Sequence, residues 1–453
     1  MRPTRLVPLV VLTVVAVLSG GLTGCGSGTD PDTLKVAYQR STDNKVQIMD
    51  GWLAGIKKQF EREHPGRKLR LIPIQASLDD YYAKVQQMMR SPRTAPDVVH
   101  EDTFLINSDI TSGYLRPLDD ELAGWKDWNR FAATAKAAAR GTDGRTYGVP
   151  DGTDTRGLWF NKEILARAGL PADWHPRTWD DVLDAARAVK RAVPGVIPLN
   201  VYSGKGAGEA TSMQGFEMLL YGTGADPLYA PAEKKWVTGS RGFRDALAFV
   251  RTVYAEKLGP EPSDALDPKV TDRVVGEWLP EGRLAIALDG SWLGKFWQPN
   301  GSRPWPRWPQ VMGRAAFPTQ DGHAPGRVSL CGGWTWSISA KSGKPGLAWQ
   351  LIETMQTPAN ATAWAVADGQ IAVRDDVAAD PAYRTALPGT DFFTELVQVS
   401  AYRPALPAYA QVSHAIQEAT ESVTTGDADP ATAARRYDER LASIAGASGV
   451  TRR

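Results

Sequence analysis

Tryptophan and charged side chains are the residues of this chain whose chemistry best suits a polar organic ligand. The sequence holds 16 Trp, and all of them lie after the first 24 residues. The flat face of an indole matches the C–H face of a sugar ring, while carboxylates and guanidinium groups bond hydroxyls. Most of the tryptophans are expected to fill the core, so the pattern points to a ligand only where they gather with charged groups.

Catalytic and metal-binding signatures are missing from the sequence. The five His stand at positions 64, 100, 175, 323 and 414, with no paired spacing that would ligate a metal. There is no Gly-x-Ser-x-Gly elbow and no phosphate-binding loop, and the glycine-rich segment 204–208 is expected to be an ordinary loop. The sequence therefore predicts no catalytic residue, no metal and no cofactor. A pair of glycosidase carboxylates stays open, because acidic residues are plentiful.

The N-terminus is typical of an exported lipoprotein. Arg2 and Arg5 precede an apolar run that ends in Leu-Thr-Gly-Cys at residues 22–25. This pattern predicts a signal peptide over residues 1–24, lipidation of Cys25, and a flexible tether over 25–32. The alternatives are a cleaved signal peptide with an incidental Cys, or a transmembrane anchor. Cys331 is then the one remaining thiol, so an internal disulfide is excluded and a small buried residue is expected there.

The charge balance of the chain does not suggest nucleic acid as a partner, and none is expected. Lys and Arg number 52 against 51 Asp and Glu, and loss of Arg2 and Arg5 with the signal peptide would leave 50 against 51, a net charge of −1. No basic stripe stands out along the chain.

The order of apolar patterns predicts an α/β fold with mainly parallel sheets flanked by helices. Strands are expected at 33–38, 69–74, 98–99, 159–160 and 284–288, and helices at 46–60, 79–89, 178–193, 347–355 and 412–423. Thr178 is a good N-cap, and Gly426 is placed to end the last helix. The Trp- and Pro-containing stretch 299–309 is expected to be a locally packed loop. A chain of 453 residues suits two domains.

Several motifs in order along the chain resemble the family 1 extracellular solute-binding proteins of bacterial ABC importers, which include maltose- and trehalose-binding proteins. The motifs cover most of the chain after the N-terminus: they are Ala-Pro-Asp-Val-Val at 95–99, Gly-Tyr-Leu-Arg-Pro-Leu-Asp at 113–119, Asp-Gly-Arg-Thr-Tyr-Gly-Val-Pro at 143–150, Gly-Leu-Trp-Phe-Asn-Lys at 157–162, Ala-Gly-Leu at 168–170, Arg-Thr-Trp-Asp at 177–180, Ala-Leu-Asp-Gly-Ser-Trp at 287–292, Gly-Gly-Trp at 332–334, Ala-Trp at 348–349 and Arg-Pro at 403–404.

The resemblance implies two lobes joined by crossing strands, with a ligand cleft between them that closes by a hinge motion. It places residues 33–153 and 334–386 in the N-terminal lobe, and residues 154–333 and 387–450 in the C-terminal lobe. The implied protein is a non-catalytic, monomeric receptor, held by a lipid on the outer face of the cytoplasmic membrane. It would capture a small oligosaccharide, such as a disaccharide, and deliver it to the permease subunits of an ABC transporter. A receptor for an amino sugar, polyol or polyamine is the alternative, followed by a lipid-anchored glycoside hydrolase.

The resemblance also carries candidate ligand-binding residues onto this sequence. They are Asp102, Asp154, Trp292, Gly333, Trp334 and Arg403, with Gln39, Arg40, Trp336 and Arg374 as weaker candidates. Trp334 and Trp336 are expected to differ by strand parity, so that one of them faces the core. For the others, a core Trp, a capping Asp or a structural Arg is the alternative. The end of the first strand departs from the disaccharide binders, because Gln-Arg-Ser at 39–41 offers no carboxylate, so trehalose and maltose are not distinguished.

Overall fold

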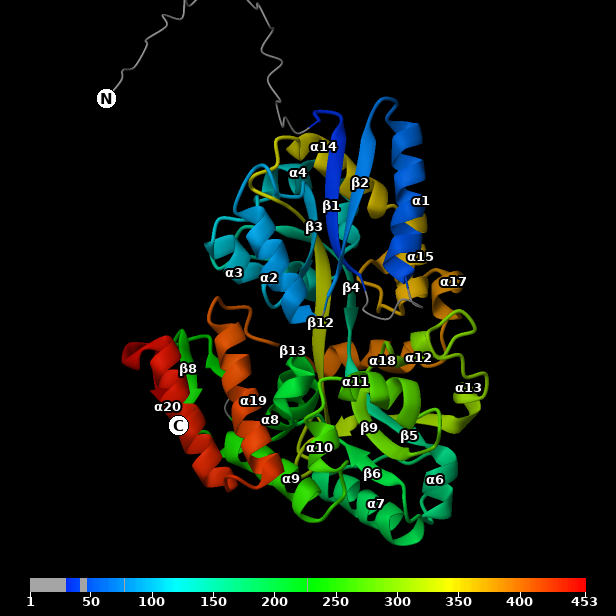
Figure 1. The fold of residues 1–453 in the computed structure, drawn as a ribbon, viewed down its shortest axis with the longest axis vertical. Helices are drawn as coiled ribbons and strands as arrows, with labels where there is room; N and C mark the ends of the chain where they lie inside the picture. Colours follow the sequence, from blue (N-terminus) through cyan, green and yellow to red (C-terminus); the bar gives the residue numbers. More distant parts are fainter. Residues whose placement is uncertain (1–29, 41–46, 77, 226) are drawn as a thin grey trace, which may run out of the picture.

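The computed structural model describes residues 30–40, 47–76, 78–225 and 227–453. The elements form two lobes stacked along the long axis of the molecule (Figure 1). The predicted two-lobed α/β fold is confirmed. The predicted signal peptide, Cys25 and most of the tether lie outside the described residues. Within the described ranges, no helix is both long and apolar enough to cross a membrane.

The N-terminal lobe is built on a sheet with the strand order β11-β12-β3-β1-β2. Strands β2 and β3 run parallel to β1, whereas β12 runs antiparallel to β3 and to β4. The strands of this sheet are β1 (Thr33–Arg40), β2 (Lys68–Gln75), β3 (Val98–Asp102), β4 (Gly148–Asp154), β11 (Phe317–Pro318), β12 (Arg327–Ile338) and β13 (Ser400–Tyr402), of which β11 and β13 pair with the first half of β12, before it enters the N-terminal lobe. The helices of the N-terminal lobe are α1 (Ile48–Glu63), α2 (Leu78–Met89), α3 (Ile106–Thr111), α4 (Asp119–Gly124), η1 (Lys126–Arg130), α5 (Ala133–Ala138), α14 (Pro345–Met355), α15 (Pro358–Asp368), α16 (Asp375–Ala378) and α17 (Pro381–Arg384).

The C-terminal lobe is built on a second sheet with the order β10-β5-β9-β6, and a third, small sheet has the order β14-β8-β7. The strands are β5 (Arg156–Asn161), β6 (Ile197–Asn200), β7 (Tyr229–Ala230), β8 (Lys235–Thr238), β9 (Leu284–Gly290), β10 (Met312–Ala315) and β14 (Val450–Arg452). The helices are α6 (Lys162–Arg167), α7 (Trp179–Ala192), η2 (Lys205–Ala207), η3 (Ala210–Glu217), α8 (Met218–Gly222), α9 (Arg241–Ala255), α10 (Pro262–Ala265), α11 (Val270–Arg273), η4 (Val274–Trp278), α12 (Leu293–Phe296), α13 (Trp308–Val311), α18 (Thr390–Leu396), η5 (Val397–Val399), α19 (Tyr409–Thr425), α20 (Pro430–Ala445) and η6 (Ala447–Gly449).

Both sheets are mixed rather than mainly parallel, because the strands that pass between the lobes enter antiparallel to their neighbours. Strand β12 pairs with β11 and β13 in its first half and with β3 and β4 in its second half. Strand β4 ends at Asp154 and β5 begins at Arg156 in the other sheet. The predicted lobe boundaries at 153/154 and 333/334 fall at these crossings, and the exact boundaries stay predictions.

Local sequence signals act as expected at several element ends. Thr178 caps α7 in a capping box with Asp181, which satisfies backbone donors that the first helical turn leaves free. Gly426 ends α19 in the left-handed conformation, with φ of 85°. The 299–309 stretch packs locally, since the rings of Trp297 and Trp305 lie 5.4 Å apart.

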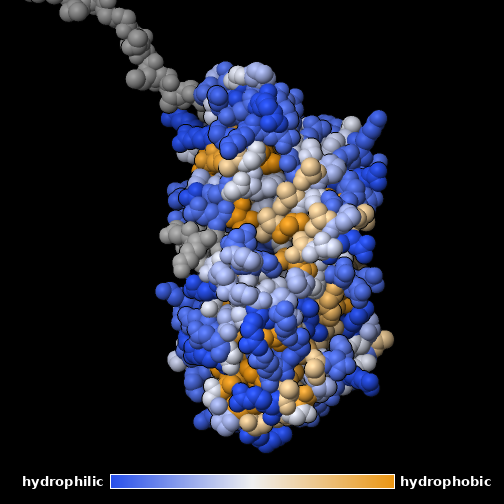
Figure 2. All heavy atoms as spheres, turned by 90° about the vertical axis from the view of Figure 1, so that its right-hand side faces the viewer, coloured by the Kyte–Doolittle hydropathy of each residue, from blue (hydrophilic) through white to orange (hydrophobic). Residues whose placement is uncertain are grey.

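Figure 2 shows the side of the molecule next to α13 and α17, where hydrophilic residues predominate and hydrophobic ones form small scattered groups.

Trp336 belongs to the core of the N-terminal lobe. Its side chain is fully buried, with a relative exposure of 0 %, and its ring lies 6.0 Å from that of Trp52 in α1. The prediction that Trp336 contacts a ligand is therefore corrected, because the residue has no surface to offer one.

Trp336→Ala is expected to lower the free energy of unfolding by about 3–5 kcal/mol, because it empties an indole-sized volume in a packed core. Chemical denaturation of the variant and the wild type measures this loss. Trp334→Ala is the matched control, since the same substitution two residues away removes a half-buried ring and should cost less. Equal losses in the two variants would contradict the assignment.

Candidate ligand-binding site

A cleft of about 580 Å³ separates the two lobes, and residues of both lobes line it. The N-terminal lobe contributes the ends of β1 and β3, the start of α1, and Trp364 to Gln370 around the end of α15. The C-terminal lobe contributes the loop before η3, the segment from α11 to η4, and the turn after β9. Eight of the ten predicted residues line this cleft: Asp102, Asp154, Trp292, Gly333, Trp334, Arg403, Gln39 and Arg40.

Two half-buried indoles reach the cleft from different strands. Trp334 lies on β12 where this strand enters the N-terminal lobe, and one of its faces stacks on His100, with ring centroids 4.6 Å apart. Trp292 follows β9, and the Arg156 guanidinium lies 4.8 Å from its ring centroid. A side chain at Gly290 would lie 2.1 Å from the Trp292 ring, so glycine is required for this ring to fold back over the strand end.

Arg403 lines the cleft and connects the two lobes. Its Nη1 donates to Glu209 Oε1 at 2.9 Å, and its Nη2 donates to Asp102 Oδ1 at 3.2 Å. The guanidinium also lies 4.5 Å from the Phe104 ring centroid. Burial alone would lower the pKa of Arg403, but the two carboxylates outweigh burial and raise that pKa well above its ordinary value. The cation is thus fixed between one carboxylate of each lobe.

Asp102 is held by three donors, which fix both of its oxygens. Besides Arg403, the Tyr82 hydroxyl donates to Oδ2 at 3.0 Å and the Phe104 N–H donates to Oδ1 at 3.0 Å. Burial raises the pKa of Asp102, and the charge of Arg403 opposes that rise. The carboxylate is therefore rigid, and it lies at the carboxyl end of β3, where a parallel sheet opens its ligand crevice.

Asp154 lies where β4 crosses to β5, and it is paired with Arg156. The Gly332 N–H donates to Asp154 Oδ1 at 2.8 Å. The neighbouring Gly333 has φ of 149°, and a side chain there would lie 2.7 Å from the Gly152 carbonyl oxygen. Glycine at 333 is thus needed for the two crossing strands to approach each other beside Asp154.

Relatives of the chain identify the kind of protein to which this cleft belongs. The profile of the bacterial extracellular solute-binding proteins matches residues 43–362. The chain belongs to this family. Because these proteins bind solutes rather than convert them, the predicted non-catalytic role is confirmed as well.

Individual relatives of this solute-binding protein are distant in sequence. The galactooligosaccharide-binding protein of Bacillus subtilis is 21 % identical over 376 residues, which are 82 % of this chain and 81 % of the relative. The maltose-bound MalE3 of T. maritima has a TM-score of 0.76 at 21 % identity, over 91 % of this chain and 99 % of that one. A solute-binding protein of Thermotoga lettingae bound with α-D-tagatose has a TM-score of 0.75 at 22 % identity, over 91 % and 99 %. These structures share the two-lobed fold.

The weaker candidates on β1, Gln39 and Arg40, line the cleft, and their side chains already bond to other residues of the protein. The Gln39 side-chain amide donates to the Ala76 carbonyl oxygen at 3.1 Å. The Arg40 guanidinium is paired with Asp50, and its Nε lies 3.0 Å from Asp50 Oδ1. Both residues shape the cleft wall, and ligand contact by either stays a prediction.

Arg374 lies outside the cleft, which corrects its proposed role. Its side chain is buried, and Nη1 donates to the Gln356 carbonyl oxygen at 2.6 Å while Nη2 donates to Asp127 Oδ2 at 2.9 Å. Together with its bonds to Asp376, these contacts use the guanidinium to join η1 to the segment after α15. Arg374 is a structural residue.

The expected difference in strand parity between Trp334 and Trp336 is also wrong. Residues two apart on a strand share a face, and both indoles stack on the same residue, His100. The two residues differ in burial. Trp334 lies at the lobe crossing and lines the cleft, whereas Trp336 lies two residues further into the N-terminal lobe and is fully buried.

Sequence reasoning missed several polar residues of the cleft. Glu209 follows the glycine-rich segment 204–208, whose Gly206 and Gly208 also line the cleft. Lys295 Nζ, from α12, pairs with Asp368 Oδ1 of α15 at 2.6 Å. Asp289 accepts bonds from the Tyr202 hydroxyl and the Gly290 N–H, both at 2.7 Å, and burial raises its pKa to about 6. The glycine spacing at 204–208 was the one sequence signal that could have pointed to Glu209.

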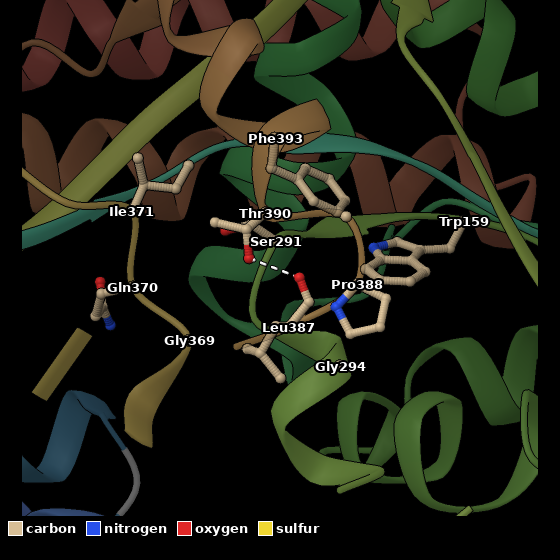
Figure 3. A pocket seen from close by; sticks show the side chains of 11 residues that line it. Trp159, Ser291, Gly294, Gly369, Gln370, Ile371, Leu387, Pro388, Thr390 and Phe393 are labelled. Atoms are coloured by element: carbon tan, nitrogen blue, oxygen red, sulfur yellow. Dashed lines mark hydrogen bonds between the residues drawn. The ribbon is translucent and has the colours of Figure 1, made fainter. Parts of the chain in front are cut away.

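A second, much smaller void is lined by residues 369–371, residues 387–390 and side chains near β5 and β9 (Figure 3). Its volume is about 20 Å³, and its lining includes Trp159, Ser291 and Phe393. The Thr390 hydroxyl donates to the Leu387 carbonyl oxygen at 2.9 Å beside it. This volume is on the order of one water molecule, so it cannot hold a sugar ring.

Among the described residues, no cluster of three or more His, Cys, Asp or Glu could hold a metal.

Glu217, at the end of the π-helix η3, extends the polar network of the cleft into the C-terminal lobe. The Tyr409 hydroxyl lies 2.6 Å from Glu217 Oε1 and 2.8 Å from Glu209 Oε1. Burial raises the pKa of Glu217 to about 8, and the Glu209 carboxylate adds to the rise. The folded protein thus keeps a neutral carboxylic acid there at neutral pH.

Glu217→Gln is expected to stabilise the protein increasingly as the pH rises from 5 to 8. The unfolded chain loses this proton near the ordinary pKa of 4.5, whereas the folded state keeps it up to about 8. The folded state therefore binds more protons in this window, and wild-type stability falls as the pH rises. Glutamine has no proton to lose, so the difference in Tm between variant and wild type should grow across thermal unfolding at pH 5, 6.5 and 8. A difference that is constant with pH would contradict the assignment.

Proposed function

We propose that this protein binds a small oligosaccharide, of about disaccharide size, in the cleft between its lobes. The observation that carries the proposal is the placement of two half-buried indoles, Trp292 and Trp334, in one cleft with oriented carboxylates and guanidinium groups. Indole faces suit the C–H faces of sugar rings, and the charged groups suit their hydroxyls. The names of the Bacillus subtilis and T. maritima relatives, which bind galactooligosaccharides and maltose, support the same ligand class.

The charged groups of the cleft are oriented before a ligand arrives. Asp102, Asp154 and Arg403 each contact at least two partners at hydrogen-bond distance. A group that is already fixed loses little conformational freedom when a sugar hydroxyl binds to it, which favours affinity. Closure of the two lobes would then remove water from these contacts and strengthen them.

The biological role that we propose is capture and delivery. The loaded, closed protein would present the sugar to the permease subunits of an ABC importer. A lipid on Cys25 would hold the protein, as a monomer, at the outer face of the cytoplasmic membrane. The flexible residues expected at 25–32 would let the receptor move while it stays close to the permease.

A panel of neutral disaccharides and trisaccharides should contain at least one sugar that raises the Tm of the purified protein, because a ligand of the folded state stabilises it by mass action. Trp334→Ala or Trp292→Ala should weaken binding of that sugar by about 10- to 100-fold, since an aromatic stacking contact is worth about 1–3 kcal/mol. Isothermal titration calorimetry measures the change.

Trp128→Ala is the matched control, because Trp128 is half-buried in the N-terminal lobe and does not line the cleft. Its sugar affinity should equal that of the wild type. A Tm that rises with a polyamine, amino sugar or polyol and with none of the neutral sugars would overturn the proposed ligand class.

Cys25→Ser is expected to move the protein from the membrane to the soluble fraction, because the thiol that would carry the lipid is lost. Fractionation of cells that express the full chain, followed by immunoblotting, measures the distribution. Cys331→Ser is the control and should stay with the membrane, since Cys331 is buried inside the fold. Membrane association of both variants would argue against lipidation.

A further inference from the structure

Three aromatic rings, those of Trp334, His100 and Trp336, form a continuous stack inside the N-terminal lobe. The His100 imidazole lies between the two indoles, with centroids 4.6 Å from Trp334 at an interplanar angle of 17° and 4.4 Å from Trp336 at 29°. His100 is on β3, opposite Trp336 of β12, and it also lines the cleft. One face of the indole proposed to hold a sugar thus rests on a titratable ring.

His100 is paired with the buried carboxylate of Asp151. Its Nε2 lies 2.8 Å from Asp151 Oδ2, and Asp151 Oδ1 is buried without a partner. Both side chains are nearly inaccessible, with relative exposures of 6 % for His100 and 1 % for Asp151. Burial raises the pKa of Asp151, and His100 opposes that rise. The charges of the two residues therefore depend on each other.

The other charged groups around the pair are already bound to partners. On β3, Asp102 is paired with Arg403, and Glu101 interacts with Asp109. On α15, Asp368 raises the pKa of Asp151 and is itself paired with Lys295. On α2, the Tyr81 hydroxyl donates to the His100 carbonyl oxygen at 2.6 Å. Asp151 is thus the acidic side chain in direct contact with the imidazole.

We propose that His100 is a positioning residue for ligand binding, and that its protonation weakens the hold of Trp334 on a sugar. This inference rests on the proposed sugar-binding function. The neutral imidazole supports the indole by stacking. The imidazolium places a positive charge against the ring and draws its π-electrons away from the face that a sugar would contact.

The physical basis is competition for one π-system. A cation over an aromatic face is attracted by the negative charge of that face, and the C–H groups of a sugar ring, which are weakly positive, use the same charge. Histidine is the side chain that changes charge within the range of pH 5 to 8. Thermodynamic reciprocity then requires that sugar binding release protons from the His100–Asp151 pair.

The first test needs no ligand. An imidazolium quenches the fluorescence of an indole in contact with it, so the tryptophan emission of the wild type should rise as the pH is raised from 5 to 8. His100→Gln should remove this rise, whereas His414→Gln should keep it, because His414 is on the exposed side of α19 beside Glu418. A pH profile that is the same in the wild type and in His100→Gln would overturn the proposal, whatever sugar the protein binds.

The second test uses the neutral sugar that gives the largest rise in Tm. Wild-type affinity, measured by titration calorimetry, should be about three- to tenfold higher at pH 8 than at pH 5, a range set by the strength of cation–π contacts. Affinity should be independent of pH in His100→Gln, and wild-type titrations in two buffers of different ionisation enthalpy should reveal proton release. Circular dichroism of each variant verifies folding.

The two proposals fail in different ways. Sugar binding by the wild type with an affinity independent of pH would overturn the role of His100 and leave the sugar receptor intact. Fluorescence that depends on His100, with no sugar bound at any pH, would overturn the sugar receptor instead. Asp151→Asn, which keeps the shape of the pair and removes its charge, should shift the midpoint of the fluorescence profile to lower pH, and an unchanged midpoint would count against the pair.

Discussion

The cleft depends on a buried guanidinium that has to be paired. Arg403 is almost inaccessible, and a cation in such a place is tolerated only when carboxylates and good geometry compensate for lost hydration. Asp102 comes from the end of a strand in one lobe, and Glu209 from the loop before η3 in the other. The pairing of one cation with both carboxylates therefore fixes how the two lobes meet beside Arg403. The same bonds orient the carboxylates on which ligand recognition is proposed to rely.

Close contact between the crossing strands sets the second condition. Strand β12 passes Asp154 and Thr153 of β4 at its own Gly332 and Gly333. A side chain at 333 would collide with the Gly152 carbonyl oxygen, and one at 332 would lie 3.0 Å from Asp154 Oδ1. The absence of side chains at this point lets the Gly332 N–H reach Asp154, and it leaves the next residue, Trp334, at the edge of the cleft.

Much of this arrangement could be predicted from the sequence, because it depends on local patterns. A few consecutive residues are enough to predict each of three features: the capping box at Thr178, the left-handed Gly426 and the strand that precedes Trp292. The resemblance to the family then gave six main site candidates, and all six line the cleft. The antiparallel entry of the crossing strands could not be predicted, because it depends on pairing between residues more than a hundred positions apart.

The errors have the same origin. Nothing near Arg374 in the sequence reveals that Asp127 is its partner, and nothing near Trp336 reveals that α1 covers it with Trp52. Glu209 was missed for a similar reason, since its role depends on Arg403, which is 194 residues away. Residue type indicated which side chains could bind a ligand, but only the fold decides which of them are already satisfied by the protein.

That distinction bears on the chemistry of the ligand. Most of the charged groups that line the cleft are engaged with one another: Asp102 and Glu209 with Arg403, Asp154 with Arg156, and Asp368 with Lys295. A carboxylate paired in this way keeps lone pairs that can accept a bond from a hydroxyl, but it no longer requires a cation from the ligand. A polyamine would have to compete with fixed guanidinium groups for each carboxylate, whereas a neutral sugar adds its hydroxyls to pairs that stay intact. The arrangement of charge thus favours a neutral, hydroxyl-rich solute. The two indoles supply an apolar surface for its C–H groups, which offsets the loss of the water that hydrates the free solute.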